Sequence, residues 1–359
     1  MRRPSLVHFT AISTEDHLSI RASLSFSRQA RHQFWQSPLP GLPPIRPVES
    51  LGLLSSKRFR LRLQGMDVND RVVLDREYDS DNFGDVHLRI PHPVEAPVVK
   101  MQVFETLTHP GLELLIGSFI PLKVAGQRKI IITDFDKTLV DTRYHSPREL
   151  WLSLRRPLSY FPPVPGSIEL VKGYMNEGFG PFVVSASPHF YENAMRDWLY
   201  RNQLYTSNIY LKDYRRMLSL FDGELFAKDL GAQGFYKLNH LVSILLMTGV
   251  PEELALVGDG FESDTLIYLT LASVLEARQD PWMVWNAVKN DRGFRLTGRQ
   301  HFQFLTKFYQ LKNLADAAPS CKVKIHIRCR AEMLERWRGH RFPWPFLNRQ
   351  LPKVDFYVA

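Results

Sequence analysis

The sequence predicts an α/β protein with a Rossmann-like parallel sheet, preceded by a β-sandwich domain. Before residue 124, short segments alternate apolar and polar residues, as strands with one buried face do, and no helical pattern separates them. After residue 125, apolar runs alternate with segments of helical periodicity, which is typical of a parallel sheet covered by helices. Three of these runs end in Asp or Ser residues, at the edge where an open α/β sheet binds its ligand.

The composition is that of a globular protein large enough for two domains, with 359 residues, 44% of them hydrophobic and 23% charged. No apolar run is long enough to span a bilayer, and the first residues lack the apolar stretch of a signal peptide, so a cytoplasmic location is expected. The two cysteines support neither a disulfide framework nor a metal site and are expected to be free thiols. The net charge of +9 favours an anionic partner, either nucleic acid or the acidic face of a membrane.

Residues 1–124 are expected to form the β-sandwich-like domain, with a structural or recognition role. Alternating patterns predict strands at residues 17–26, 58–63, 86–90 and 98–104. Between the first two of these lies a proline-rich loop, which cannot continue a sheet ladder. Nothing in this domain has catalytic spacing.

Residues 125–290 are expected to form the catalytic domain, because polar side chains follow three successive strands. Ile130 to Ile132 form an apolar run that ends at Asp134 and Asp136. The next strand ends at Ser185, before a helix predicted from about residue 191 to 201, and a third apolar run ends at Asp259. Although Asp and Ser are also ordinary turn and cap residues, their recurrence at three strand ends favours one site.

Residues 291–359 are expected to be a basic and aromatic C-terminal extension. They contain a segment rich in Lys, Arg and aromatic residues at 298–313, a strand-like run at 322–329 and a predicted helix at 331–338. The aromatic residues fit nucleic-acid stacking and membrane-interface anchoring equally well, and packing of the extension on the core is favoured over either.

Two carboxylates separated by one residue in a turn suit a two-step phosphoryl transfer. Asp134 would attack phosphorus as the nucleophile, and Asp136 would act first as the acid and then as the base. Attack by an anion on an anion needs a cation, and oxygen ligands suit Mg²⁺, which Asp134, the backbone carbonyl of Asp136 and Asp259 would hold. The Ser185 hydroxyl and the backbone N–H of Ala186, before a helix N-terminus, suit a phosphate group.

These residues resemble the four motifs of the haloacid-dehalogenase superfamily of phosphohydrolases, with DFDKT at 134–138, VVSAS at 183–187, a lysine, and GDGFESD at 258–264. Residues 127–275 are further similar to the catalytic domain of actin-patch-type phosphatidate phosphatases and their bacterial relatives. The similarity rests on VSASPHFYENAMRDWL, on LKDY at 211–214 and on LALVGDGFESDTLIYLTLA. The sequence departs from that branch at Gly260 and Phe261, where Ser and Gly are usual, at His189, where Trp is common, and at Lys137, where a second acidic residue is common.

The resemblance implies a phosphate-binding lysine and a supporting carboxylate. Lys237 fits best, at the start of the helix before the third strand, with Lys212 and Lys228 as alternatives. Thr138 is expected to add a phosphate contact. Asp264 is expected to support the metal site, and it would also suit the N-cap of a helix that starts at Thr265.

The resemblance to the lipid branch implies hydrolysis of phosphatidate to diacylglycerol and phosphate, with transient association at a membrane surface. The short stretch between Thr138 and Ser185 leaves room for a small cap or none, which suits a large substrate that excludes water itself. A phosphatase acting on a nucleic acid end, a phosphoprotein or a small phosphorylated metabolite would use the same motifs. The non-enzymatic alternative is a degenerate binding module of the same fold. The sequence carries no signal for an oligomeric state.

Overall fold

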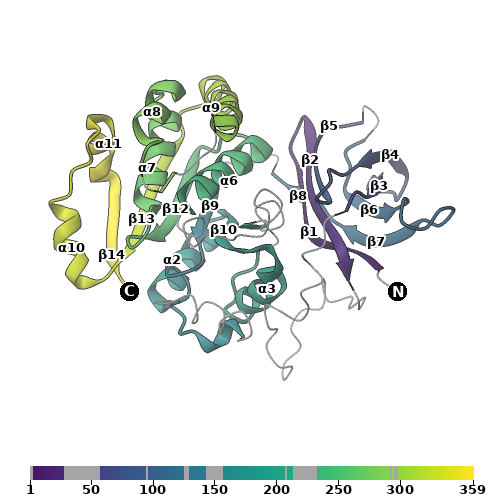
Figure 1. Ribbon diagram of the computed structural model, residues 1–359, viewed down its shortest axis with the longest axis horizontal. Coiled ribbons are helices and arrows are strands. Elements are labelled where there is room, and N and C mark those ends of the chain that lie inside the picture. Colours follow the sequence, from purple (N-terminus) through teal and green to yellow (C-terminus); the bar gives the residue numbers. More distant parts are fainter. Residues whose placement is uncertain are drawn as a thin grey trace. The chain divides into compact units, whose positions relative to one another are not determined.

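The structure is a computed structural model that describes residues 3–27, 57–93, 96–124, 129–142, 157–206, 208–212, 233–291, 293–294 and 298–359 (Figure 1). The chain divides into two compact units. Among the described residues, the first unit holds those up to 124 together with Pro188–Met195, and the second holds the others.

The first unit contains two four-stranded sheets, ordered β5-β2-β1-β8 and β4-β3-β6-β7. Its strands are β1 (Arg3–Ser13), β2 (His17–Ser27), β3 (Arg60–Met66), β4 (Val72–Asp79), β5 (Asp85–Pro91), β6 (Lys100–Glu105), β7 (Leu114–Phe119) and β8 (Leu122–Lys123). The pairs are antiparallel except β1 with β8. Leu18 and Leu24 from one sheet share a hydrophobic core with Leu61 and Leu63 from the other, as expected of a sandwich.

The four strands predicted for this unit correspond to β2, β3, β5 and β6, whereas β1, β4, β7 and β8 were not predicted. The side chains of β1 are buried almost without interruption between residues 4 and 12, including the polar residues His8 and Thr10, which hydrogen-bond to each other. Those of β4 are mostly exposed. Strand β4 therefore lacks the pattern of a strand with one buried face, whereas β1 alternates apolar and polar residues from Val7 to Ala11 and is buried on both faces.

The second unit is built on a six-stranded sheet in the order β11-β10-β9-β12-β13-β14. Its strands are β9 (Lys129–Asp134), β10 (Gly180–Pro188), β11 (Ile209–Lys212), β12 (Glu253–Asp259), β13 (Lys322–Cys329) and β14 (Val354–Val358). The pairs from β10 to β14 are all parallel. Counted along the chain, this is the doubly wound order 3-2-1-4-5-6, whose direction of winding reverses between β9 and β12. The prediction of an α/β protein with a parallel sheet is confirmed.

Helices connect the strands of this sheet. In the part of the chain that the structure describes, they are α2 (Pro165–Asn176), α3 (Glu192–Arg201), α6 (Gln233–Thr248), α7 (Asp264–Leu275), α8 (Pro281–Val288), α9 (Gly298–Ala317), α10 (Ala331–Arg338) and α11 (Pro345–Gln350). Helices α6 and α7 contact each other, and α9 packs against both. Every residue of α7 is buried, which explains why its sequence is apolar on all sides.

The C-terminal residues belong to the main sheet, contrary to the prediction of an extension. The strand-like run at 322–329 is β13, which pairs in parallel with β12 from Glu253↔Lys322 to Asp259↔Arg328. Strand β14 then pairs with β13. Parallel pairing joins residues far apart in sequence, so local periodicity predicts the strand but not its neighbour.

Some predictions fall outside the described residues. These are the proline-rich loop and Lys228. Within the described ranges, no helix combines the length and apolar character needed to cross a membrane.

Candidate functional site

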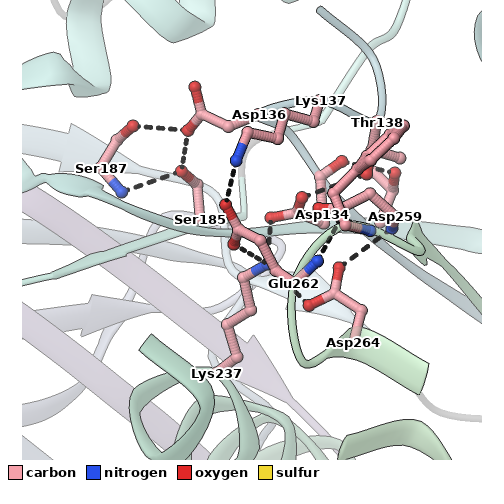
Figure 2. A network of polar contacts seen from close by, with 12 residues as sticks. Asp134, Asp136, Lys137, Thr138, Ser185, Ser187, Lys237, Asp259, Glu262 and Asp264 are labelled. Atoms are coloured by element: carbon pink, nitrogen blue, oxygen red, sulfur yellow. Dashed lines mark hydrogen bonds and ion pairs between the residues drawn. The ribbon is translucent and has the colours of Figure 1, made fainter. Parts of the chain in front are cut away.

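The three strand ends singled out in the sequence meet at one edge of the sheet (Figure 2). Asp134 ends β9, Asp259 ends β12, and Ser185 lies near the end of β10. Since β9 lies between β10 and β12, the Asp134 side chain is central. The site therefore lies at the reversal point of the winding order, where doubly wound sheets bind their ligands.

Asp134 is buried and contacts two of the predicted site residues. The Thr138 hydroxyl donates to its Oδ2 at 3.1 Å. Lys237 Nζ lies 3.2 Å from its Oδ1 as an ion pair, without the alignment of a hydrogen bond. Burial raises the pKa of Asp134 well above its usual value. Lys237 opposes the shift, and Asp264 and Asp259 add to it.

Asp136 points away from Asp134, toward the end of β10 (Figure 2). Its Oδ2 accepts hydrogen bonds from the Ser185 hydroxyl at 2.9 Å and the Ser187 hydroxyl at 2.7 Å. The Ser187 N–H donates to Ser185 Oγ at 3.0 Å. Burial raises the pKa of Asp136, and the two hydroxyl donors partly offset the shift. Ser185 thus orients Asp136 in this structure.

Three carboxylates could hold a metal ion. Single oxygens of Asp134, Asp259 and Asp264 all lie within 4.8 Å of one another. Asp259 Oδ1 accepts hydrogen bonds from the N–H groups of Phe261 and Glu262 at 2.6 and 2.9 Å, whereas its Oδ2 is buried without a partner. Asp134 Oδ1 has no hydrogen bond either.

The charges of this cluster fit a cation. Burial raises the pKa of Asp259 to about 8, with further contributions from Asp264 and Glu262 that Lys237 opposes. Buried like charges are unfavourable unless a cation compensates them, and two carboxylate oxygens that accept no hydrogen bond, Asp134 Oδ1 and Asp259 Oδ2, are the hard ligands that Mg²⁺ prefers. The residues present therefore fit the expected ion. Asp136 was predicted to add its backbone carbonyl.

Asp264 is the first residue of α7 and not its N-cap, which is Ser263. Its Oδ1 accepts a hydrogen bond from Lys237 Nζ at 2.7 Å, and its Oδ2 accepts one from the Asp259 N–H at 3.1 Å. A Cβ atom at Gly258 would lie 2.6 Å from Asp264 Oδ2, so only glycine allows this close approach. Asp264 thus connects the predicted lysine to the predicted metal ligand.

Lys237 is the lysine that the structure brings to Asp134. It lies in the first turns of α6, where a cation is unfavourable beside the positive end of the helix dipole unless an anion is near. Burial lowers its pKa, but Asp134, Asp264 and Glu262 outweigh this and hold the pKa well above its usual value. Lys212 is buried at the end of β11, two strands away from β9 in the sheet order.

Three residues of the site were not predicted. Ser187 lies within the VVSAS motif and Glu262 within GDGFESD, so both were close to predicted positions. Glu262 contacts Lys137 Nζ at 2.8 Å and Lys237 Nζ at 3.5 Å. The third is Arg328, which is buried near the end of β13 although Lys322 and Lys324, at alternate positions of the same strand, are exposed. The sequence alone carries no signal that separates Arg328 from these exposed lysines.

Arg328 connects the turn after β9 to the loop after β12. Its guanidinium is buried and donates to the Lys137 carbonyl at 2.5 Å, with Asp141 Oδ1 at 3.4 Å. Its own carbonyl accepts a hydrogen bond from the Gly260 N–H at 2.8 Å. Lys137 has a positive φ of 60°, which a side-chain-bearing residue adopts only when its surroundings hold it there. We infer that Arg328 stabilises this turn.

We expect Arg328→Met to lower the free energy of unfolding by about 2 kcal/mol, since the Lys137 carbonyl loses a charged donor in a buried place. Urea denaturation measures the change. Arg349→Met is the control, because Arg349 is exposed in α11 of the same unit and should change stability by no more than about 0.5 kcal/mol. Equal effects of the two substitutions would contradict the role of Arg328.

We expect Asp259→Asn to raise the midpoint of thermal unfolding in EDTA by about 5 °C, because it removes an acid whose burial beside other carboxylates is unfavourable, as its raised pKa shows. The wild-type midpoint should rise with Mg²⁺, and that of the variant should respond far less. Asp316→Asn, the same change at an exposed position in α9, should leave both behaviours unaltered. If Mg²⁺ raised the unfolding midpoint of Asp259→Asn as much as that of the wild type, Asp259 would not be a ligand of the metal ion.

Comparisons with known proteins leave the family open. No protein-family model matches the chain, and no curated protein matches it. Among solved structures, a β-glucuronidase from Parabacteroides merdae is 8% identical over 91% of this chain and 34% of its own, with a TM-score of 0.27. A β-glucuronidase from Ruminococcus gnavus is 8% identical over 100% and 54%, with a TM-score of 0.25. A glycosyl hydrolase family 2 member from Bacteroides cellulosilyticus is 10% identical over 99% and 44%, with a TM-score of 0.23. The chain spans about a third to a half of these proteins, and similarity this low establishes neither a common fold nor a common activity.

Proposed function

We propose that the protein is a Mg²⁺-dependent phosphomonoester hydrolase that works through an aspartyl phosphate on Asp134. The observation that carries the proposal is the placement of Asp134. Its carboxylate lies at the ligand-binding edge of a doubly wound sheet, with Lys237 Nζ 3.2 Å from Oδ1 and two further carboxylates within 4.8 Å. A nucleophile, a fixed cation and ligands for a metal ion are the groups that phosphoryl transfer requires.

In the first step, an oxygen of Asp134 attacks phosphorus and the bond from phosphorus to the alcohol oxygen breaks. Protonated Asp136 gives its proton to the departing alkoxide, so an alcohol leaves and the phosphoryl group stays on Asp134. The hydroxyls of Ser185 and Ser187 hold the Asp136 carboxyl group on the side that faces β10, away from the nucleophile. This separation supports different roles for the two aspartates.

In the second step, water attacks the phosphorus of the aspartyl phosphate. Asp136, now ionised, takes a proton from the water as the new bond forms, and the bond from Asp134 to phosphorus breaks. Inorganic phosphate leaves and both aspartates return to their first state. The Thr138 hydroxyl, which donates to Asp134 Oδ2 at 3.1 Å, keeps the carboxylate orientation through both steps.

Asp134, Asp259 and the Asp136 carbonyl would hold Mg²⁺. Asp264 would support the site by accepting a hydrogen bond from the backbone N–H of Asp259. When bound, Mg²⁺ neutralises negative charge on the nucleophile and the phosphoryl oxygens. Lys237 supplies a fixed positive charge on the same side. The Ala186 N–H is a proposed donor to the phosphoryl oxygens, and the Ser185 hydroxyl would join it only by turning from Asp136 Oδ2, to which it donates in this structure.

The sequence motifs further support a haloacid-dehalogenase-like fold with a small cap or none. The resemblance of several sequence segments to phosphatidate phosphatases and the net charge of +9 favour phosphatidate as the substrate. The protein would then be cytoplasmic and would bind this lipid at the surface of a membrane. Phosphatidate carries its phosphomonoester at the lipid surface, where an uncapped site can reach it.

The test is phosphate release from an aryl phosphate with Mg²⁺ and with EDTA, followed by trapping of the intermediate. Brief incubation with labelled substrate and denaturation should leave label on the protein in a form that hydroxylamine removes, as an acyl phosphate requires. Turnover that is unchanged in EDTA would refute the metal-dependent mechanism. No turnover of any phosphomonoester would favour the degenerate binding module.

A panel of phosphatidate in mixed micelles, a 3′-phosphorylated oligonucleotide, a phosphopeptide and a sugar phosphate tests the substrate. We expect phosphatidate to have the highest kcat/KM. If phosphatidate is turned over no faster than the sugar phosphate and the oligonucleotide is preferred, the lipid proposal fails. A phosphatase that acts on a nucleic acid end is then the better interpretation.

A further inference from the structure

Glu262 bridges two lysines beside the nucleophile (Figure 2). Its Oε1 lies 2.8 Å from Lys137 Nζ, and its Oε2 lies 3.5 Å from Lys237 Nζ. The three residues come from different segments, since Lys137 lies in the turn after β9, Glu262 in the loop before α7, and Lys237 in α6. One carboxylate thus occupies two cations that converge on the proposed phosphate position.

The row of charges runs from the buried nucleophile toward solvent. The exposed fraction of the side chain is 4% for Lys237, 21% for Glu262 and 31% for Lys137. Lys237 contacts Asp134 at the inner end, whereas Lys137 forms the outer end. The three groups are therefore ordered by exposure, from Lys237 beside the nucleophile to Lys137.

A carboxylate and a phosphate dianion make the same demand on these lysines, because both offer several anionic oxygens to ammonium donors. Glu262 is also held in place, since its backbone N–H donates to Asp259 Oδ1 at 2.9 Å. The carboxylate is thus a fixed part of the site, within reach of the cations that a phosphate needs.

We infer that Glu262 is an internal competitor of phosphate for Lys137 and Lys237, and that Lys137 is the second cation of the phosphate subsite. This inference rests on the proposed function. Competition by Glu262 weakens binding of the phosphate group alike in the substrate and in free inorganic phosphate. Affinity must then come from the organic part of the substrate, and the inorganic product leaves readily. The site accordingly selects phosphomonoesters whose organic part binds elsewhere on the protein.

The chain contains a matched control for Glu262. Glu253 also bridges two lysines, Lys129 at 3.2 Å and Lys324 at 3.3 Å, and its side chain is 26% exposed. It lies at the start of β12, whereas Glu262 follows the end of that strand. Glu253→Gln therefore removes the same charge from the same kind of bridge at the opposite end of the strand.

The experiment measures the affinity of inorganic phosphate for the Mg²⁺-loaded protein by calorimetry. We expect Glu262→Gln to bind phosphate about 10-fold more tightly than the wild type, and Lys137→Met about 10-fold more weakly, the size of a charge-assisted hydrogen bond. Glu253→Gln should bind as the wild type does. Thermal unfolding of each variant identifies any that fails to fold, and Lys137→Met tests the same subsite should Glu262→Gln be such a variant.

Unchanged or weaker phosphate binding by folded Glu262→Gln would overturn the inference, as would unchanged binding by Lys137→Met. These outcomes are separate from the proposed reaction, because binding is scored without turnover. If Glu262→Gln binds phosphate more tightly but the wild type hydrolyses no phosphomonoester, the proposed function fails and the competition stands. If the wild type hydrolyses phosphomonoesters but the affinities do not change, only the competition fails.

Discussion

Asp134→Asn is expected to reduce Mg²⁺-dependent phosphate release by about 10⁴-fold or more, which is the usual loss of rate when a covalent nucleophile is removed. An amide is close to a carboxylate in shape but lacks its anionic oxygen, so it cannot form the acyl phosphate. The variant should still fold, because the substitution reduces the electrostatic repulsion within a buried group of carboxylates.

Asp134 is also a proposed metal ligand, so the measurement must separate the two roles. Phosphate release is therefore measured over a range of Mg²⁺ concentrations beside Asp259→Asn, which removes a proposed ligand and leaves the nucleophile. We expect high Mg²⁺ to restore part of the activity of Asp259→Asn and none of that of Asp134→Asn. Labelled phosphate should not be trapped on Asp134→Asn. Turnover by Asp134→Asn comparable to the wild type would show that another group attacks phosphorus.

The sheet and the residues at its edge were accessible from sequence because each depends on local pattern. Ile130 to Ile132 are buried on both faces of β9, which is why the run is apolar without alternation. Strands β9 and β12 end at Asp134 and Asp259, Ser185 lies near the end of β10, and parallel order alone brings such ends to one edge. The grouping of these residues therefore followed from the type of sheet, without knowledge of any distance.

What the sequence did not predict depends on contacts between distant segments. Arg328 reaches the Lys137 carbonyl because β13 pairs with β12, an arrangement that the strand's own pattern does not encode. The hydroxyl of Ser185 donates to Asp136, where a phosphate contact was expected, and the direction of a side chain at a strand end follows from its neighbours. The structure likewise reveals the Glu262 bridge, because its three charges come from three segments.

Lys237→Met is expected to reduce phosphate release by about 10²- to 10³-fold, as for the loss of one preorganised charge-stabilising donor. Lys237 is buried with Asp134 at 3.2 Å and Asp264 at 2.7 Å, so its charge is fixed beside the nucleophile before any substrate binds. A fixed charge acts on the transition state without reorganisation, which is why the loss should appear mainly in kcat.

Removing Lys237 also removes a buried counter-charge, which costs about 3–5 kcal/mol of stability where the partner carboxylates stay ionised. Thermal unfolding with Mg²⁺ present therefore accompanies each assay, and activity is expressed per folded molecule. The control is Lys212→Met, since Lys212 is also buried but ends β11, which β10 separates from β9. It should retain activity within about threefold of the wild type. If Lys212→Met lost phosphate release and Lys237→Met kept the activity of the wild type, Lys212 would be the phosphate-binding lysine. The ion pair of Lys237 with Asp134 and Asp264 would then serve only to compensate buried charge.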